Sequence, residues 1–273
     1  MTSGTQAVNR VVTSPWTERL ARLGLAVRGV LYLVLGVLAL RVAFGDRGQQ
    51  ANQNGALQEV ASQPFGKVLI WIVAIGLTGY ALWRLASAAF GTRADPAASK
   101  TSSRVRALLE GIGYGSVAVA AFRIAASGGS SQGKRGGASG WTAKVLEWPA
   151  GPLLVGAVGV LVAAAGLYLA LEGWRADFIK ELKLFEVGPG ARRAVILLGR
   201  VGRIARGAAF ALIGGLIVAA AVTYDPSKAK GLDGALKTLA TQPYGMWLLA
   251  AVAVGLMAFG LYCLAESRLR RIS

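Results

Sequence analysis

The chain has 273 residues, of which 54% are hydrophobic and 16% are charged, against about 25% charged residues in a typical soluble protein. Its 30 Lys and Arg residues give a formal net charge of +17, and they lie mainly between long apolar runs, which favours a membrane surface over nucleic acid as partner. With no histidine and one cysteine, Cys263, the chain can form neither a Ser–His–Asp or Cys–His set nor an internal disulfide.

Six apolar runs follow one another along the chain, each about 20 residues long. A helix of that length crosses the roughly 30 Å of hydrocarbon in a bilayer. The first run is longer than the apolar part of a signal peptide, so we expect it to be retained as a span. The predicted spans are Leu23–Phe44, Val68–Phe90, Val105–Ala126, Pro152–Leu171, Val201–Val222 and Met246–Ala265.

The short segments between the runs differ in charge from one side to the other. Those on the side of the N- and C-termini carry 17 Lys and Arg residues, and those on the other side carry 8. Because cytoplasmic loops are enriched in cations, we expect a multi-pass protein of the bacterial inner membrane with both termini in the cytoplasm. We expect anionic lipids of the cytoplasmic leaflet as partners.

Two segments on the predicted cytoplasmic side lie outside the runs. Residues 1–19 are predicted to form a disordered tail. Within Trp174–Val187, the residues Phe178, Leu182 and Phe185 recur at helical spacing, with cations on other faces. This pattern fits either a helix lying in the inner headgroup layer or a linker helix packed on the bundle.

The loops that join each odd run to the next even run repeat one another. Each contains a cap-forming residue followed by glycine, then about nine residues later a proline, and a second glycine two residues after the proline. Because Asn, Ser and Asp cap helices and proline ends them, each loop predicts a short capped helix, a break and re-entry into the membrane. The repeat positions are Asn54, Gly55, Pro64 and Gly66, then Ser139, Gly140, Pro149 and Gly151, then Asp233, Gly234, Pro243 and Gly245.

The odd helices repeat as well, with small residues at spacings that favour close helix packing. The first copy has Arg28 followed by Gly29, and the third has Arg206 followed by Gly207 at an offset of 178 residues. The second copy, at an offset of 82 residues from the first, places Glu110 where the other two have arginine. The chain is therefore predicted as repeat 1 (20–91), repeat 2 (104–173), a cytoplasmic amphipathic linker (174–196) and repeat 3 (197–273).

These motifs resemble a bacterial membrane family catalogued as domain of unknown function number twelve-oh-six. The resemblance rests on the Gly-x-x-x-Arg-Gly start at residues 24–29, the Asn-Gly-Ala-Leu and Gln-Pro-Phe-Gly loop at 54–66, and the threefold hairpin. It runs from about Leu20 to the end, and repeat 2 departs most, with Glu110 and with Trp-Pro-Ala-Gly at 148–151. The resemblance implies six spans and a membrane location, and it supplies no activity and no catalytic residue.

Charged residues inside the spans are the main functional clue, because they are costly in hydrocarbon. Arg28, Glu110 and Arg206 each lie about a turn and a half from the cytoplasmic end of their helix, roughly 9 Å by helical rise. The arginines could snorkel to the interface, Glu110 could pair with Arg28 or Arg206, or the two arginines could bind an anion or a lipid headgroup. Other charged residues near span ends are predicted to anchor the interface, namely Arg41, Arg84, Arg123, Glu172 and Glu266.

The sequence thus predicts an all-α integral membrane protein whose six transmembrane helices form three parallel two-helix repeats in a pseudo-threefold arrangement. One function class is a non-enzymatic scaffold or lipid- and partner-binding protein, and the other is a small-solute or ion pore or transporter along the pseudo-threefold axis. Transport usually needs polar groups at mid-membrane, whereas the central stretches here are Gly, Ala, Leu and Val. We therefore favour the first class, and we expect no enzymatic activity, cofactor or metal.

Overall fold

The structure is a computed structural model, and it describes residues 15–45, 51–63, 66–90, 101–126, 138–183, 185 and 187–270. Over these residues the chain is all-α, with six long helices and three short ones that follow α2, α5 and α8. The long helices are α2 (Pro15–Ala43), α4 (Gly66–Phe90), α5 (Thr101–Ala126), α7 (Gly151–Arg175), α8 (Pro189–Val222) and α10 (Gly245–Leu269). The short helices are α3 (Gln53–Ser62), α6 (Ala138–Leu146) and α9 (Leu232–Ala240), and two 3₁₀ turns are η2 (Asp177–Glu181) and η4 (Pro226–Lys228).

All six long helices are long and apolar enough to cross a membrane, so the chain is a multi-pass membrane protein. Two of them begin well before the predicted spans. α8 starts at Pro189, a favourable first helical residue, and its 34 residues extend about 51 Å, more than the hydrocarbon thickness. α2 starts at Pro15, so residues 15–19, which were predicted as tail, belong to its first turns; residues 1–14 lie outside the described part.

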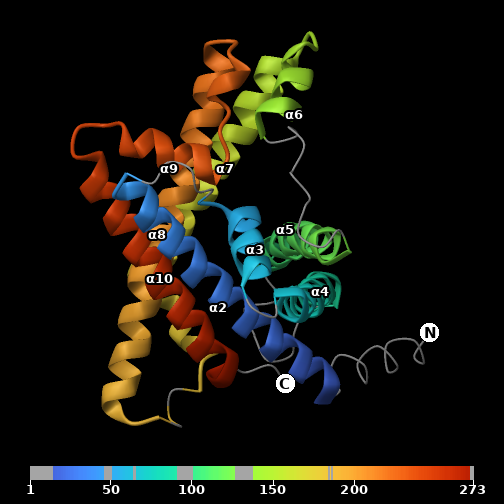
Figure 1. Ribbon diagram of the computed structural model, residues 1–273, viewed down its shortest axis with the longest axis vertical. Helices are drawn as coiled ribbons and strands as arrows, with labels where there is room; N and C mark the ends of the chain where they lie inside the picture. The colour runs from blue at the N-terminus through green and yellow to red at the C-terminus, as the bar shows by residue number, and fades with distance from the viewer. Residues whose placement is uncertain are drawn as a thin grey trace.

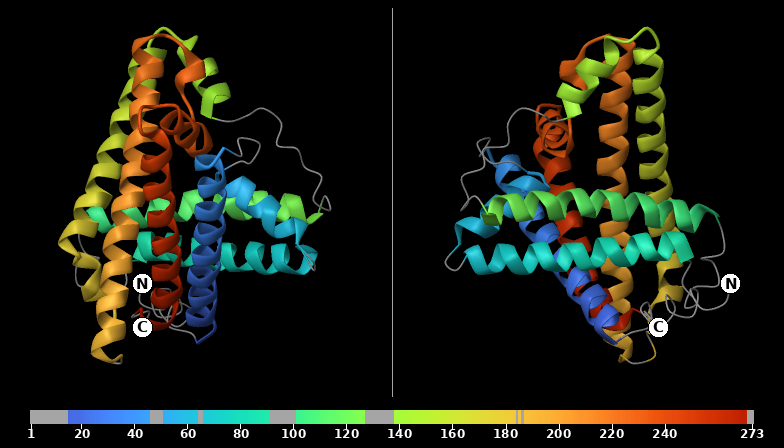
Figure 2. Two further views of the ribbon diagram at one scale, coloured as in Figure 1. Left: turned by 60° about the vertical axis from the view of Figure 1, so that its left-hand side comes forward. Right: turned by 90° about the vertical axis from the view of Figure 1, so that its right-hand side faces the viewer.

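The three repeats are joined in a ring of helix pairs. α4 of repeat 1 packs most extensively on α5 of repeat 2, α7 of repeat 2 packs on α8 of repeat 3, and α10 of repeat 3 packs on α2 of repeat 1. The predicted pseudo-threefold arrangement is therefore a cyclic one, in which each repeat packs one long helix on each of the other two repeats. The pairs differ in direction, since α4 and α5 lie side by side across the other four long helices (Figures 1 and 2).

Glycines at one repeat position lie at each of the three pair interfaces. A Cβ atom on Gly29 of α2 would lie 2.8 Å from the carbonyl oxygen of Gly260 in α10, and one on Gly207 of α8 would lie 2.6 Å from that of Gly166 in α7. The equivalent Gly111 of α5 meets a leucine of α4 in the same way. These glycines let the backbones approach closely, as is usual for helices packed in a bilayer.

The same backbone hydrogen bond closes the break before each even helix in all three repeats. The amide of Gly66 donates to the carbonyl of Gln63, that of Gly151 to Trp148 and that of Gly245 to Gln242, at 2.7, 2.8 and 2.7 Å. Glycine is required because a Cβ there would lie 1.9 to 2.2 Å from a carbonyl oxygen of the preceding short helix. Pro149 and Pro243 each lie three residues after the short helix ends, whereas Pro64 lies outside the described residues.

The prediction that Asn54, Ser139 and Asp233 cap the short helices is wrong. Each is the second residue of its helix, and Gly55, Gly140 and Gly234 are the third. The cap of α3 is Asn52, whose side chain accepts a hydrogen bond from the Gly55 amide, and the cap of α9 is Gly231. Asp233 instead accepts a hydrogen bond at 2.9 Å from the amide of Ala51, which joins repeat 3 to repeat 1.

The segment Trp174–Val187 is not a helix lying in the headgroup layer. Ala176 adopts a left-handed backbone conformation that ends α7, and the 3₁₀ turn η2 follows. Phe178 and Leu182 are buried in the bundle, and the amide of Lys183 donates to the carbonyl of Leu269 at 2.8 Å. The linker therefore packs on the bundle, as the second interpretation expected, but it does so as a 3₁₀ turn and not as an α-helix, and Phe185 remains 76% exposed.

Candidate functional site

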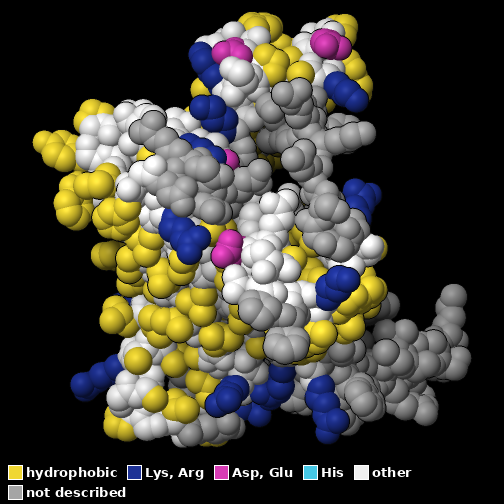
Figure 3. Space-filling view, in the orientation of Figure 1, with side chains coloured by type: hydrophobic (Ala, Val, Ile, Leu, Met, Phe, Trp, Pro, Cys, Tyr) yellow, Lys and Arg dark blue, Asp and Glu magenta, His cyan; other side chains and the backbone are white. Residues whose placement is uncertain are grey.

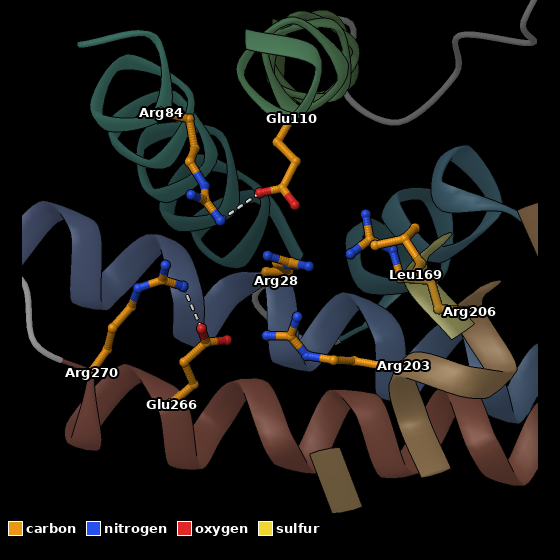
Figure 4. Close-up of a pocket in the computed structure, with 8 residues that line it drawn as sticks. All are labelled: Arg28, Arg84, Glu110, Leu169, Arg203, Arg206, Glu266 and Arg270. Atoms are coloured by element: carbon orange, nitrogen blue, oxygen red, sulfur yellow. Dashed lines mark hydrogen bonds and ion pairs between the residues drawn. The ribbon is translucent and has the colours of Figure 1, made fainter. Parts of the chain in front are cut away.

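Charged side chains from α2, α4, α5, α8 and α10 meet in one pocket (Figure 4). We call the N-terminal ends of α2, α5 and α8 and the C-terminal ends of α4, α7 and α10 the linker ends. The pocket has a cavity volume of about 10 Å³, which is room for about one water molecule. Its lining residues are Arg28, Arg84, Glu110, Leu169, Arg203, Arg206, Glu266 and Arg270.

The pocket lies where the three repeats meet, because repeat-equivalent residues line it from each copy. Arg28 of α2, Glu110 of α5 and Arg206 of α8 occupy one repeat position, and all three reach the pocket. A second repeat position contributes Arg84 of α4 and Leu169 of α7 to the lining, and its third member, Cys263 of α10, is fully buried. The candidate charge cluster predicted from the sequence is thus brought together in space.

The ion pair that the structure gives Glu110 is with Arg84, and the prediction of Arg28 or Arg206 as its partner is wrong. The Arg84 Nη2 and Glu110 Oε2 atoms are 2.6 Å apart, and both side chains are 9% exposed. Tyr80 links this pair to Arg28, because its hydroxyl accepts from Arg28 at 2.6 Å and donates to Glu110 at 3.0 Å. Glu110 and Arg28 therefore belong to one hydrogen-bonded network through a bridging tyrosine.

Two further carboxylates, predicted to anchor the interface, are buried in the same cluster. Glu172 pairs with Arg203 at 2.8 Å, and Arg203 also donates to the hydroxyl of Tyr262 at 3.3 Å. Glu266 pairs with Arg270, the residue that follows the end of α10. The prediction of interface anchoring is therefore wrong for Glu172, Glu266 and Arg84, whereas Arg41 and Arg123 are exposed. The misplaced residues lie within two turns of a helix end, where hydropathy does not separate a snorkelling charge from a buried one.

Arg28 and Arg206 do not snorkel to the surface. Arg28 is 3% exposed and Arg206 is 9% exposed, and both are surrounded by aromatic rings. The Arg28 guanidinium lies 5.1 Å from the ring centre of Tyr114 and 4.9 Å from that of Phe259. The Arg206 guanidinium lies 5.2 Å from the same Phe259 ring, so one aromatic side chain contacts both cations.

The chemistry of this site favours an anion over a metal ion. The pocket is lined by five arginines and two glutamates, and within the described residues no group of His, Cys, Asp and Glu could hold a metal ion. Arginine stays protonated in proteins, so the positive charge of the cluster is permanent.

Five members of the site were not predicted as such, namely Arg84, Arg203, Arg270, Glu172 and Glu266. One signal was available, since Glu172 and Glu266 occupy the same repeat position, 85 and 179 residues after Ser87. Because the two glutamates occupy the same repeat position, we would expect their carboxylates to have similar surroundings. The arginines that pair with them carry no repeat signal, since Leu25 and Ala107 occupy the positions equivalent to Arg203.

Comparison with known proteins gives the same threefold division. The family model described as Domain of Unknown Function (DUF1206) matches three times, over residues 23–91, 105–176 and 201–270. Uncharacterized protein YxxB of Bacillus subtilis (strain 168) is 34% identical over 258 residues, which cover 93% of this chain and 91% of that protein. No solved structure matches the chain. The three consecutive matches and the full-length relative show that the chain belongs to the DUF1206 family.

Proposed function

We propose that this protein is a non-enzymatic membrane protein that binds anionic lipids through the cationic surface at its linker ends, in the bacterial cytoplasmic membrane and with both termini in the cytoplasm. The observation that carries this proposal is a group of exposed cations beside exposed aromatic side chains. Figure 3 shows Lys and Arg side chains along the lower edge of the molecule, below a broad hydrophobic surface.

The group is formed by the linker and the first turns of α8. Arg192, Arg193 and Arg200 are exposed on α8, and Trp174 and Phe185 nearby in the chain are 74% and 76% exposed. Aromatic rings beside cations are typical of a segment at the headgroup level. Each cation near an anionic leaflet contributes about 1 kcal/mol of attraction.

Purified protein in neutral detergent, titrated with phosphatidylglycerol or with phosphatidylcholine of the same acyl chains, tests this proposal. We expect phosphatidylglycerol to raise the unfolding temperature more, and added salt to reduce the difference, because salt screens exposed charges. In the variant Arg192→Gln/Arg193→Gln/Arg200→Gln the preference should fall.

The matched control is Arg41→Gln/Lys228→Gln/Lys230→Gln, which removes three exposed cations at the opposite end of the helices. This variant should keep the preference for phosphatidylglycerol. Equal preference in the parent and in the α8 variant would show that the linker ends do not bind anionic lipid.

A pore or transporter for small anions is the second candidate function. Arg28 and Arg206 support it, because buried ionisable residues in membrane proteins often lie on ion pathways, and both reach the pocket where the repeats meet. The narrowness of that pocket, about 10 Å³, supports binding over conduction. Chloride efflux from proteoliposomes above the rate of empty vesicles, lost in Arg206→Gln, would favour transport.

A further inference from the structure

We call the five arginines and two glutamates that line the pocket, together with Glu172, the pocket cluster. Its three carboxylates are each paired with an arginine, and two arginines remain. Glu110 pairs with Arg84, Glu172 with Arg203 and Glu266 with Arg270. Among the described residues, Arg28 and Arg206 have no carboxylate within ion-pair distance. Figure 4 shows both in the same pocket, so two positive charges there are uncompensated.

The remaining contacts of Arg28 and Arg206 do not neutralise them. Arg28 donates to the hydroxyl of Tyr80, but the Nε–H groups of both arginines are buried with no acceptor in hydrogen-bond distance. The rings of Tyr114 and Phe259 attract the guanidinium groups through their faces but carry no net charge. A buried charge needs a partner, and arginine cannot escape the cost by losing its proton.

We propose that Arg28 and Arg206 bind a small monovalent anion of the halide class in this pocket. The assignment rests on the charge of the two arginines and on the volume of the cavity. The two uncompensated arginines supply positive charge and free N–H donors, and the cavity of about 10 Å³ admits a particle close to the size of one water molecule. A phosphate group, with five heavy atoms, would have to displace side chains that are held by the three ion pairs.

The net charge of the site depends on the one repeat that has a glutamate where the other two have an arginine. Arginine at all three equivalent positions would place three cations around one pocket, and Glu110 replaces one of them. Glu110 is itself balanced by Arg84, so it does not cancel Arg28 or Arg206. The result is a net charge of two on the described pocket cluster, which an anion lowers to one.

The test uses the full chain in maltoside detergent without added lipid, so that its outcome does not depend on the proposed lipid binding. The unfolding temperature is measured in sodium chloride, sodium bromide and sodium gluconate at constant ionic strength. We expect chloride and bromide to raise it with a saturating dependence on concentration. In Arg206→Gln, half-saturation should need at least about tenfold more chloride, because a charged hydrogen bond is lost.

A second variant keeps the proposal testable if Arg206→Gln does not fold, and a third variant is the control. Arg206→Glu places a carboxylate opposite Arg28 and removes both excess charges, so it should fold with an unfolding temperature independent of chloride. Arg41→Gln removes an exposed arginine outside the pocket and should respond to chloride as the parent does.

Three results would overturn the proposal. The first is the same chloride dependence in the parent and in Arg206→Gln or Arg206→Glu. The second is equal stability of the parent in chloride and gluconate. The third comes from two parallel series, one with sodium phosphate and one with added phosphatidylglycerol. Stabilisation there that is lost in Arg206→Gln, without stabilisation by halide, would assign the site to a phosphate or a lipid headgroup instead.

Discussion

At the scale of single residues, one substitution in a threefold repeat decides the electrostatics of the centre. Glu110 stands where the other copies have Arg28 and Arg206, and the three residues became a candidate site because they are charged residues inside the spans at one repeat position. The partner of Glu110 was not predictable in the same way. Arg84 has Leu169 and Cys263 as its equivalents, so no pattern marks it, and only the packing of α4 on α5 brings it to Glu110.

Removing the Glu110 carboxylate should therefore destabilise the protein through Arg84. We expect Glu110→Gln to cost roughly 3–5 kcal/mol of the free energy of unfolding, because a buried arginine loses its ion pair. Thermal unfolding in detergent measures the loss, and Glu147→Gln, at an exposed carboxylate, is the control. The double variant Arg84→Leu/Glu110→Gln should lose less than Glu110→Gln alone. Equal stability of Glu110→Gln and Glu147→Gln would mean that the pair contributes nothing.

At the scale of elements, the loop motif predicted the order of the elements correctly, but it placed the start of the short helices at the wrong residue. A short helix, a break and a second helix occur at all three described loops. The caps were misplaced by two residues in α3 and α9, because Asn and Asp favour both the cap and the first turn of a helix. The linker Trp174–Val187 was left between two interpretations because its spacing fits both, and the left-handed Ala176 that breaks it has no signal in the sequence.

The turn glycines provide the prediction at this scale. In Gly151→Ala the new Cβ would lie 2.0 Å from the carbonyl oxygen of Val145, so the start of α7 must shift against α6. We expect a loss of about 1–3 kcal/mol, measured by thermal or denaturant unfolding in detergent. Gly156→Ala in the same helix is the matched control, because its Cβ would lie 3.6 Å from Ala221. The same loss in both variants would show that helix flexibility, and not the turn, is responsible.

At the scale of the whole molecule, the repeat predicted the number and class of helices but not how they pair. Hydropathy fixes where spans are, because a lipid-facing helix must be apolar along its length. Pairing depends on which surfaces of two helices fit. Glycines lie at the α2–α10 interface and at the α7–α8 interface alike, so a glycine does not by itself select the partner helix. The crosswise direction of the α4–α5 pair is likewise a result of packing, with no counterpart in the sequence pattern (Figure 2).

The orientation of the molecule is a prediction that α8 makes directly testable. Gly190 is exposed in the first turn of this helix and Lys228 is exposed beyond its other end, so a single span separates them. We expect an impermeant maleimide to label Lys228→Cys in intact bacteria and Gly190→Cys only after the membrane is permeabilised, because the cation-rich side faces the cytoplasm. The native Cys263 is fully buried and should give little background, and Cys263→Ala serves as the parent for both variants. Labelling of Gly190→Cys, and not of Lys228→Cys, in intact cells would place the linker on the outer face and reverse the assigned orientation.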